Sequence, residues 1–168
     1  SLIVKLTGTV ASPLPNGTTL PNTGWVRCTE WPEAVSSTFT TQVHSTTALQ
    51  ATKSSLDVNG GDLQPGDVLR YQITLENMGN QNQTDNPGNE LVDVIPLHAV
   101  YVPASATASS GSVIFNSGDN RVEWNGPVNV GAPVVVTFDV QVDNGLANGT
   151  IIANHASAYY DANGDGSN

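Results

Sequence analysis

Residues 69–76 read Leu69-Arg70-Tyr71-Gln72-Ile73-Thr74-Leu75-Glu76, and this stretch decides the fold class. Apolar and polar side chains alternate along it without a break. Because successive side chains of a β-strand point to opposite faces, the pattern predicts a strand with one face in a core and one face in water. The run Val134–Val142 alternates in the same way and predicts a second strand of this kind.

Shorter apolar runs predict the remaining strands, and Pro- and Gly-containing turns separate them. Such runs occupy residues 91–95, 98–102, 112–115 and 121–124. Pro and Gly recur about every ten residues, which leaves little room for the 3.6-residue period of a helix. Many short strands at this spacing predict an all-β protein built as an antiparallel, immunoglobulin-like β-sandwich.

The chain also repeats itself over a long period. Residues 3–26 align with residues 135–158 without a gap, and seven of the 24 positions are identical. Both copies contain the phrase Leu-x-Asn-Gly-Thr between two apolar runs. A period of 132 residues indicates duplication of a whole domain, not a short solenoid repeat. The fold is therefore predicted to be of the tandem-repeat type.

The repeat divides the chain into three parts. Residues 47–160 form one complete module, residues 1–46 hold the terminal strands of a preceding partial repeat, and residues 161–168 form a polar junction. Strands are expected in the partial repeat at Leu2–Ala11, Thr19–Cys28 and Thr38–His44. Its apolar stripe must be covered, either by the sheet of the complete module or by another subunit. The residues expected to take part in assembly are Leu2, Val4, Leu6, Val10 and Leu20.

Composition excludes several classes of function. The net charge is −10, which argues against nucleic acid, whose phosphates require a basic surface. No run of about 20 apolar residues is present, so the chain is not expected to be embedded in a membrane. Cys28 is the one cysteine; we expect a small core residue, with a contact between chains as the alternative.

Several blocks together resemble a known family. They are Ala48–Ser54, which looks like an opening strand, Leu63–Gly79 with its Pro65-Gly66-Asp67 turn, Leu91–Pro96, His98–Val102, Val122–Trp124 and Asn148–Ala156. These blocks are similar to the bacterial and archaeal cell-surface repeat known as DUF11, the "conserved repeat domain". The resemblance covers about residues 47–160. It implies a secreted or cell-surface, Ig-like module that is strung in tandem and has no enzyme activity.

The last residues have the spacing of a calcium-binding loop. Asp161, Asn163 and Asp165 alternate and are followed by Gly166, an arrangement that can wrap oxygen ligands around a hard cation. The acidic residue that would close such a loop is not among them. A plain polar turn between modules is the alternative interpretation.

Asn82 is the better of the candidate glycosylation sites. Three sequons occur, at Asn16, Asn82 and Asn148. The first and third fall within the duplicated phrase, where Asn-Gly is expected to form a turn. Asn82 lies in a polar run, 77–89, that reads as an exposed loop.

Lys53, Asp93 and Asn154 suggest a covalent hypothesis. Lys53 belongs to the opening strand, Asn154 to the last and Asp93 to a middle one. Some Gram-positive surface domains join a Lys to an Asn through an isopeptide bond, with a buried acid assisting. The nucleophile is a neutral lysine, which needs an apolar site. In the alternative interpretation, Lys53 is an exposed edge charge and Asn154 a turn residue.

Taken together, these patterns predict a non-catalytic structural module of an extracellular surface protein. It would act as a stalk segment, or as a self-assembling filament subunit that donates strands to its neighbour. Its partners would be further copies or neighbouring repeats, and calcium would be its one cofactor. The alternative is an adhesin or carbohydrate-binding module that binds a host or glycan ligand through exposed loops such as 77–89.

Overall fold

The computed structural model describes residues 3–30 and 34–168, with the side chains of residues 34–37 left aside, and the described chain is all β. The strands are β1 (Thr19–Val26), β2 (Ala34–Gln42), β3 (Leu49–Asp57), β4 (Val68–Asn77), β5 (Leu91–Val94), β6 (Ala99–Tyr101), β7 (Thr107–Ala108), β8 (Ser112–Asn116), β9 (Arg121–Asn125), β10 (Val134–Val142) and β11 (Ala156–Ala158). No helix of the described residues is long and apolar enough to cross a membrane.

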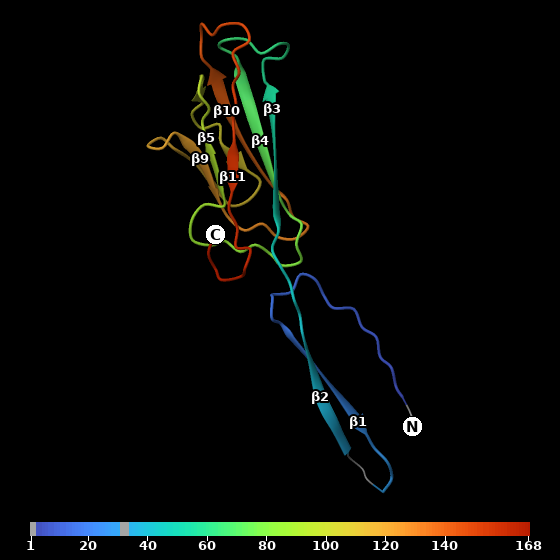
Figure 1. Ribbon diagram of the computed structural model, residues 1–168. Helices are drawn as coiled ribbons and strands as arrows, with labels where there is room; N and C mark the ends of the chain where they lie inside the picture. Colours follow the sequence, from blue (N-terminus) through green and yellow to red (C-terminus); the bar gives the residue numbers. More distant parts are fainter. Residues whose placement is uncertain (1–2, 31–33) are drawn as a thin grey trace.

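Two antiparallel sheets face each other and form a β-sandwich (Figure 1). One sheet has the order β3-β4-β10-β6, with β7 also paired to β10. The other has the order β11-β5-β9-β8. The long central pair β4–β10 places Ile73 opposite Val136 and Tyr71 opposite Phe138. The predicted fold class is therefore confirmed.

The core fills the space between the two sheets. From the first sheet come Ile73, Leu75, Val136 and Phe138, which are fully buried or nearly so. The second sheet contributes Leu91, Val122 and Trp124. Burying each large apolar side chain contributes about 1.5–3 kcal/mol. The alternating runs that predicted β4 and β10 thus supply one wall of the core.

The duplicated phrase folds into the same turn twice. Gly17 and Gly149 both have the left-handed backbone that glycine adopts most easily, with φ of 81° and 84°. In the first copy, the Thr18 amide and hydroxyl both donate to the Pro15 carbonyl, at 3.2 and 2.7 Å. In the second copy, Thr150 donates in the same way to the carbonyl three residues earlier, at 3.1 and 2.7 Å. The internal repeat is thus visible in structure as well as in sequence.

The partial repeat, residues 1–46, contains a hairpin that projects from one end of the sandwich (Figure 1). Strands β1 and β2 pair only with each other in the described chain, as a separate two-stranded sheet. The alternative in which this segment adds to the sheet of the complete module is therefore wrong. The expected strands Thr19–Cys28 and Thr38–His44 correspond to β1 and β2, with shifted ends.

The strand expected at Leu2–Ala11 does not form. Residues 3–11 follow an extended path but pair with no strand of the described chain, and Leu2 lies outside the described residues. A strand requires hydrogen-bonding neighbours, and nothing beside this segment corresponds to β4, which flanks the equivalent strand β10. Val4, Leu6 and Val10 are consequently exposed, by 75%, 81% and 51%.

Candidate functional site

Lys53, Asp93 and Asn154 meet at one edge of the sandwich, between its two sheets. Lys53 lies on β3 opposite Ile73 of β4. Asp93 lies on β5 of the other sheet, where it is opposite Ala156 and Val122. Asn154 comes two residues before β11. The fold therefore brings together three residues that are far apart in sequence.

The Lys53 ammonium group is directed inward. Its Nζ donates a hydrogen bond to Asp93 Oδ2, and the Lys53 side chain is only 18% exposed while that of Asp93 is fully buried. The same Nζ stands 4.6 Å from the centroid of the Tyr71 ring and 5.7 Å from that of Phe138. The interpretation of Lys53 as an exposed edge charge is therefore wrong.

Burial displaces the protonation equilibria of both charged partners. Desolvation lowers the pKa of Lys53 below its usual value, although the hydrogen bond and the charge of Asp93 act in the opposite direction. Desolvation likewise raises the pKa of Asp93, against the opposing effects of Lys53 and Asn154. Each shift acts toward the neutral form of its group, a free amine for Lys53 and a carboxylic acid for Asp93.

The polar side-chain atoms of Asn154 are buried at this place without good hydrogen bonds. Burial raises the pKa of Tyr71 above its usual value. Asn154 lies close enough to act in the opposite direction on the pKa of both Tyr71 and Asp93. Yet its Oδ1 and Nδ2 have no well-formed partner, and neither has Asp93 Oδ1. Buried polar atoms are nearly always hydrogen-bonded, so three such atoms in one cluster require an explanation.

The aromatic wall of this site was not identified from the sequence as part of it. Tyr71 and Phe138 pack against each other with their ring centroids 5.4 Å apart, and the lysine nitrogen lies over both rings. The sequence assigned both only to the buried stripes of their strands. Which residue of β3 would stand over them depends on the β3–β4 register, which the pattern leaves open.

The C-terminal loop closes on its own hydrogen bonds. Asp161 accepts backbone N–H groups from Gly164, Asp165 and Gly166, at 2.6–3.1 Å. The Asn163 amide in turn donates to Asp165 Oδ2 at 2.9 Å. No group of three acidic, histidine or cysteine side chains in residues 3–30 and 34–168 could hold a metal ion. Calcium binding by Asp161, Asn163 and Asp165 stays a prediction.

A buried polar cluster that the sequence did not reveal holds this loop to the module. Glu90 accepts hydrogen bonds from the amide of Asn86, the amide of Gly126 and the side chain of Asn168. Gln83 accepts from the Asp161 amide at 3.1 Å. These contacts satisfy a fully buried carboxylate and fix the end of the chain in place.

Two further candidates have different surroundings from those expected. Asn82 is half-buried, and its Oδ1 accepts a hydrogen bond from the Val130 amide at 3.0 Å. Its glycosylation stays a prediction. Cys28 is exposed, so its assignment as a core residue is wrong. It lies beyond the end of β1, where the hairpin has no core.

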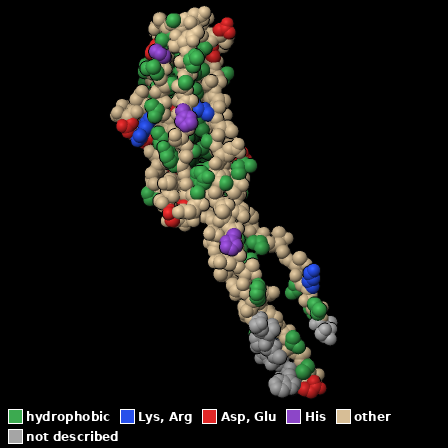
Figure 2. Space-filling view, viewed as in Figure 1, with side chains coloured by type: hydrophobic (Ala, Val, Ile, Leu, Met, Phe, Trp, Pro, Cys, Tyr) green, Lys and Arg blue, Asp and Glu red, His purple; other side chains and the backbone are tan. Residues whose placement is uncertain are grey.

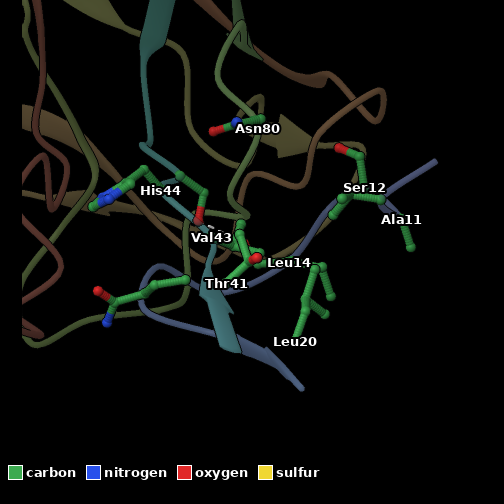
Figure 3. A pocket seen from close by; sticks show the side chains of 11 residues that line it. Ala11, Ser12, Leu14, Leu20, Thr41, Val43, His44 and Asn80 are labelled. Atoms are coloured by element: carbon green, nitrogen blue, oxygen red, sulfur yellow. Dashed lines mark hydrogen bonds between the residues drawn. The ribbon is translucent and has the colours of Figure 1, made fainter. Parts of the chain in front are cut away.

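A shallow groove lies where the hairpin meets the module. Leu14, Leu20 and Val43 line it together with His44 and Asn80 (Figure 3). Leu20, expected to take part in assembly, is thus half-buried at the junction. Apart from His44, the residues that line the groove carry no titratable group. The groove therefore has fewer side chains that could act as an acid, a base or a nucleophile than the site at Lys53 has.

Comparison with known proteins supplies a family and no activity. Among solved structures, the fold is similar to the RrgA Jo.In complex, with a TM-score of 0.43 and 8% sequence identity over 63% of this chain and 70% of that one. A likeness this distant carries no functional argument. No curated protein matches the sequence significantly.

A family model does match, over residues 48–166. It is a different model from the cell-surface repeat DUF11, which stays a resemblance. Because the match covers more than half of the sequence, the chain belongs to the family described as Domain of unknown function (DUF7927).

Proposed function

We propose that this chain is a non-catalytic structural segment of an extracellular surface protein, in which modules follow one another as a stalk. The observation that supports this proposal best is the duplicated turn. The same hydrogen bonds form at Thr18 and at Thr150, so the turn before β1 of the hairpin matches the turn before β11 of the module. This duplication supports a serial arrangement of modules.

The contacts at the junction support a stiff connection. Ser45 is buried, and its hydroxyl donates to the Leu14 carbonyl at 2.7 Å. Asn16 accepts from the Ser45 amide through its side chain, and its own amide donates to Gln81 Oε1. Hydrogen bonds thus tie the duplicated turn to both the connecting segment and a loop of the module.

Small-angle X-ray scattering on the full chain tests the stalk. We expect the scattering of one rigid, elongated particle. The double substitution Asn16→Ala and Ser45→Ala should broaden the distance distribution. It removes the bonds that the Ser45 hydroxyl donates to the Leu14 carbonyl and to Gln81 Oε1, and the bond that Asn16 Oδ1 accepts from the Ser45 amide. Asn129→Ala, at an exposed position of the module, is the matched control. A wild-type chain that already scatters as two flexibly joined bodies would refute the stalk.

Self-assembly into a filament is the finer version of this proposal. Several exposed apolar side chains lie along the hairpin and the segment before it, as Figure 2 shows in green. Sedimentation velocity should then reveal concentration-dependent association that Val4→Asp with Leu6→Asp abolishes. Leu97→Asp, at a position 78% exposed on the module, should not change it. Repeating the measurement with calcium and with a chelator tests the loop at Asp161.

The adhesin alternative predicts a monomer that binds a glycan or a host protein through the 77–89 loop. Much of that loop is engaged within the molecule. The side chains of Asn77 and Gln83 are buried and hydrogen-bonded. A monomer in sedimentation that binds a glycan array would favour this alternative over the stalk.

A further inference from the structure

We propose that Lys53 and Asn154 become joined by an intramolecular isopeptide bond, formed within the folded chain with Asp93 as the acid–base group. This inference goes beyond the proposed function and does not depend on it. A bond of this kind is a property of one module, whether that module serves as a stalk, a filament subunit or an adhesin.

The geometry supplies each of the parts that the reaction requires. An amine nucleophile is directed inward and held by Asp93. An aromatic wall of Tyr71 and Phe138 keeps water away from one side of it. The acceptor amide of Asn154 lies beside the same carboxyl group. The polar atoms of Asn154 and Asp93 Oδ1, which lack partners, are the atoms that would change their bonding.

The electrostatics agree with this arrangement. An amine attacks a carbonyl carbon only in its neutral form, and desolvation lowers the pKa of Lys53 in that direction. A carboxyl group polarises an amide carbonyl only when it carries a proton to donate, and desolvation raises the pKa of Asp93 accordingly. The shift at Lys53 therefore favours the amine without its extra proton, and the shift at Asp93 favours the carboxyl group that can donate one.

The reaction balances without any cofactor. Lys53 Nζ attacks Asn154 Cγ, while protonated Asp93 donates a hydrogen bond to Oδ1. A proton passes from Nζ through the Asp93 carboxyl group to the amide nitrogen of Asn154. The bond between Cγ and Nδ2 then breaks, and ammonia leaves. One Nζ–Cγ amide is formed for each ammonia released, with no oxidation or reduction.

Two other outcomes are chemically distinct. Lys53 could instead form an amide with Asp93 itself, which would release water. It could also stay as a plain buried partner of Asp93, which would leave the mass unchanged. The mass of the denatured chain separates all three outcomes.

The first experiment is an intact-mass measurement on the full chain under denaturing conditions. We expect a mass lower than that of the sequence by one ammonia. Asn-Gly steps can also lose ammonia as succinimides, so the link itself must be mapped. Trypsin does not cleave after an acylated lysine. A digest should therefore yield residues 28–70 joined to residues 122–168.

Variants assign the roles. Lys53→Arg, Asn154→Ala and Asp93→Asn should each restore the full mass and abolish the joined peptide. Asn22→Ala is the matched control, because Asn22 holds the same position in the first copy of the repeat and is exposed. Lys5→Arg serves as a control for the lysine. Both controls should keep the link.

A further variant, Asn154→Asp, keeps the test valid if the other substitutions prevent folding. Asn154→Asp has nearly the same shape and should still form the bond, now with release of water. Circular dichroism on each variant establishes that it folds. A wild-type chain with its full sequence mass would overturn the proposal, and so would a link mapped to Asp93 instead of Asn154.

Discussion

Asn22 and Asn154 occupy the same place in the duplicated phrase, but their surroundings are opposite. Each follows the turn glycine of its copy, Gly17 or Gly149, by five residues. Asn22 lies on β1 opposite Phe39 and is exposed. Asn154 is half-buried beside Asp93 and Tyr71. The same residue in the same repeat thus provides a surface amide in one copy and a reactive neighbour in the other.

This contrast gives a first prediction, on stability. A cross-link that closes a loop of about 100 residues stabilises a fold by about 4–5 kcal/mol, mainly by restricting the unfolded chain. Asn154→Ala should therefore lower the free energy of unfolding by about this amount, whereas Asn22→Ala should change it by less than about 0.5 kcal/mol. Denaturation in guanidinium chloride measures both. Equal effects of the two substitutions would contradict the prediction.

A second prediction concerns pH in the chain that lacks the link. In Asn154→Ala, the buried Asp93 should keep a pKa raised above its usual value of 3.8. The folded state then binds the Asp93 proton more tightly than the unfolded state. The stability that this tighter proton binding at Asp93 contributes is fully present below pH 3.8, and it is lost as the pH rises through the pKa of Asp93 in the folded state.

Unfolding of Asn154→Ala at several pH values measures this dependence. The double variant Asn154→Ala with Asp93→Asn is the control, since it cannot titrate at this position. Its curve should lack the loss of stability above pH 3.8. Coincident slopes for the two proteins would show that Asp93 has an ordinary pKa in the fold.

A third prediction concerns the junction. A Cβ atom on Gly79 would lie 2.2 Å from the Thr46 carbonyl oxygen and 2.9 Å from the Ala48 amide nitrogen. Gly79→Ala must therefore displace the segment that leads from the hairpin into β3. We expect a loss of about 1–3 kcal/mol, together with greater flexibility in solution scattering. Gly8→Ala is the matched control, because nothing lies within 4 Å of its Cβ position.

A fourth prediction concerns the C-terminal loop. Asp161 accepts three backbone N–H groups, and hydrogen bonds to a charged acceptor contribute about 1.5–3 kcal/mol each when they are well formed. Asp161→Ala should free the amides of Gly164 and Gly166. Hydrogen exchange should then accelerate at those amides and stay unchanged in β4 and β10. Unaltered protection of the loop would contradict this role.

The sequence was sufficient to predict the strands that have one solvent-exposed face and one buried face. Strand β10 extends over Val134–Val142 as its alternation indicated, because each side chain position has only two environments to choose between. The duplicated turn could also be predicted, since glycine readily adopts the left-handed conformation that Gly17 and Gly149 have. Strand alternation and turn conformation both depend on a few consecutive residues, so a short stretch of sequence is enough to predict them.

The lysine site was only partly accessible from sequence. Lys53 lies on a strand whose residues are all exposed or half-buried, and its pattern resembles that of an exposed edge. Its inward direction follows from the β3–β4 register and from the position of the second sheet over it. The exposure of Cys28 and the absence of a strand at residues 3–11 have a related origin. Each depends on which neighbours are present in space, and a local pattern cannot supply them.

The chain enters and leaves the module at the same end, because the loop after β11 returns to the side where β3 begins (Figure 1). Tension applied between the segment before β3 and the segment after β11 would therefore peel these two strands away from the sandwich, one residue pair at a time. A bond between Lys53 and Asn154 would carry that load directly from one strand to the other. Residues 54–153 would then lie outside the path of the force, and the module would lengthen by only the few residues on either side of the bond.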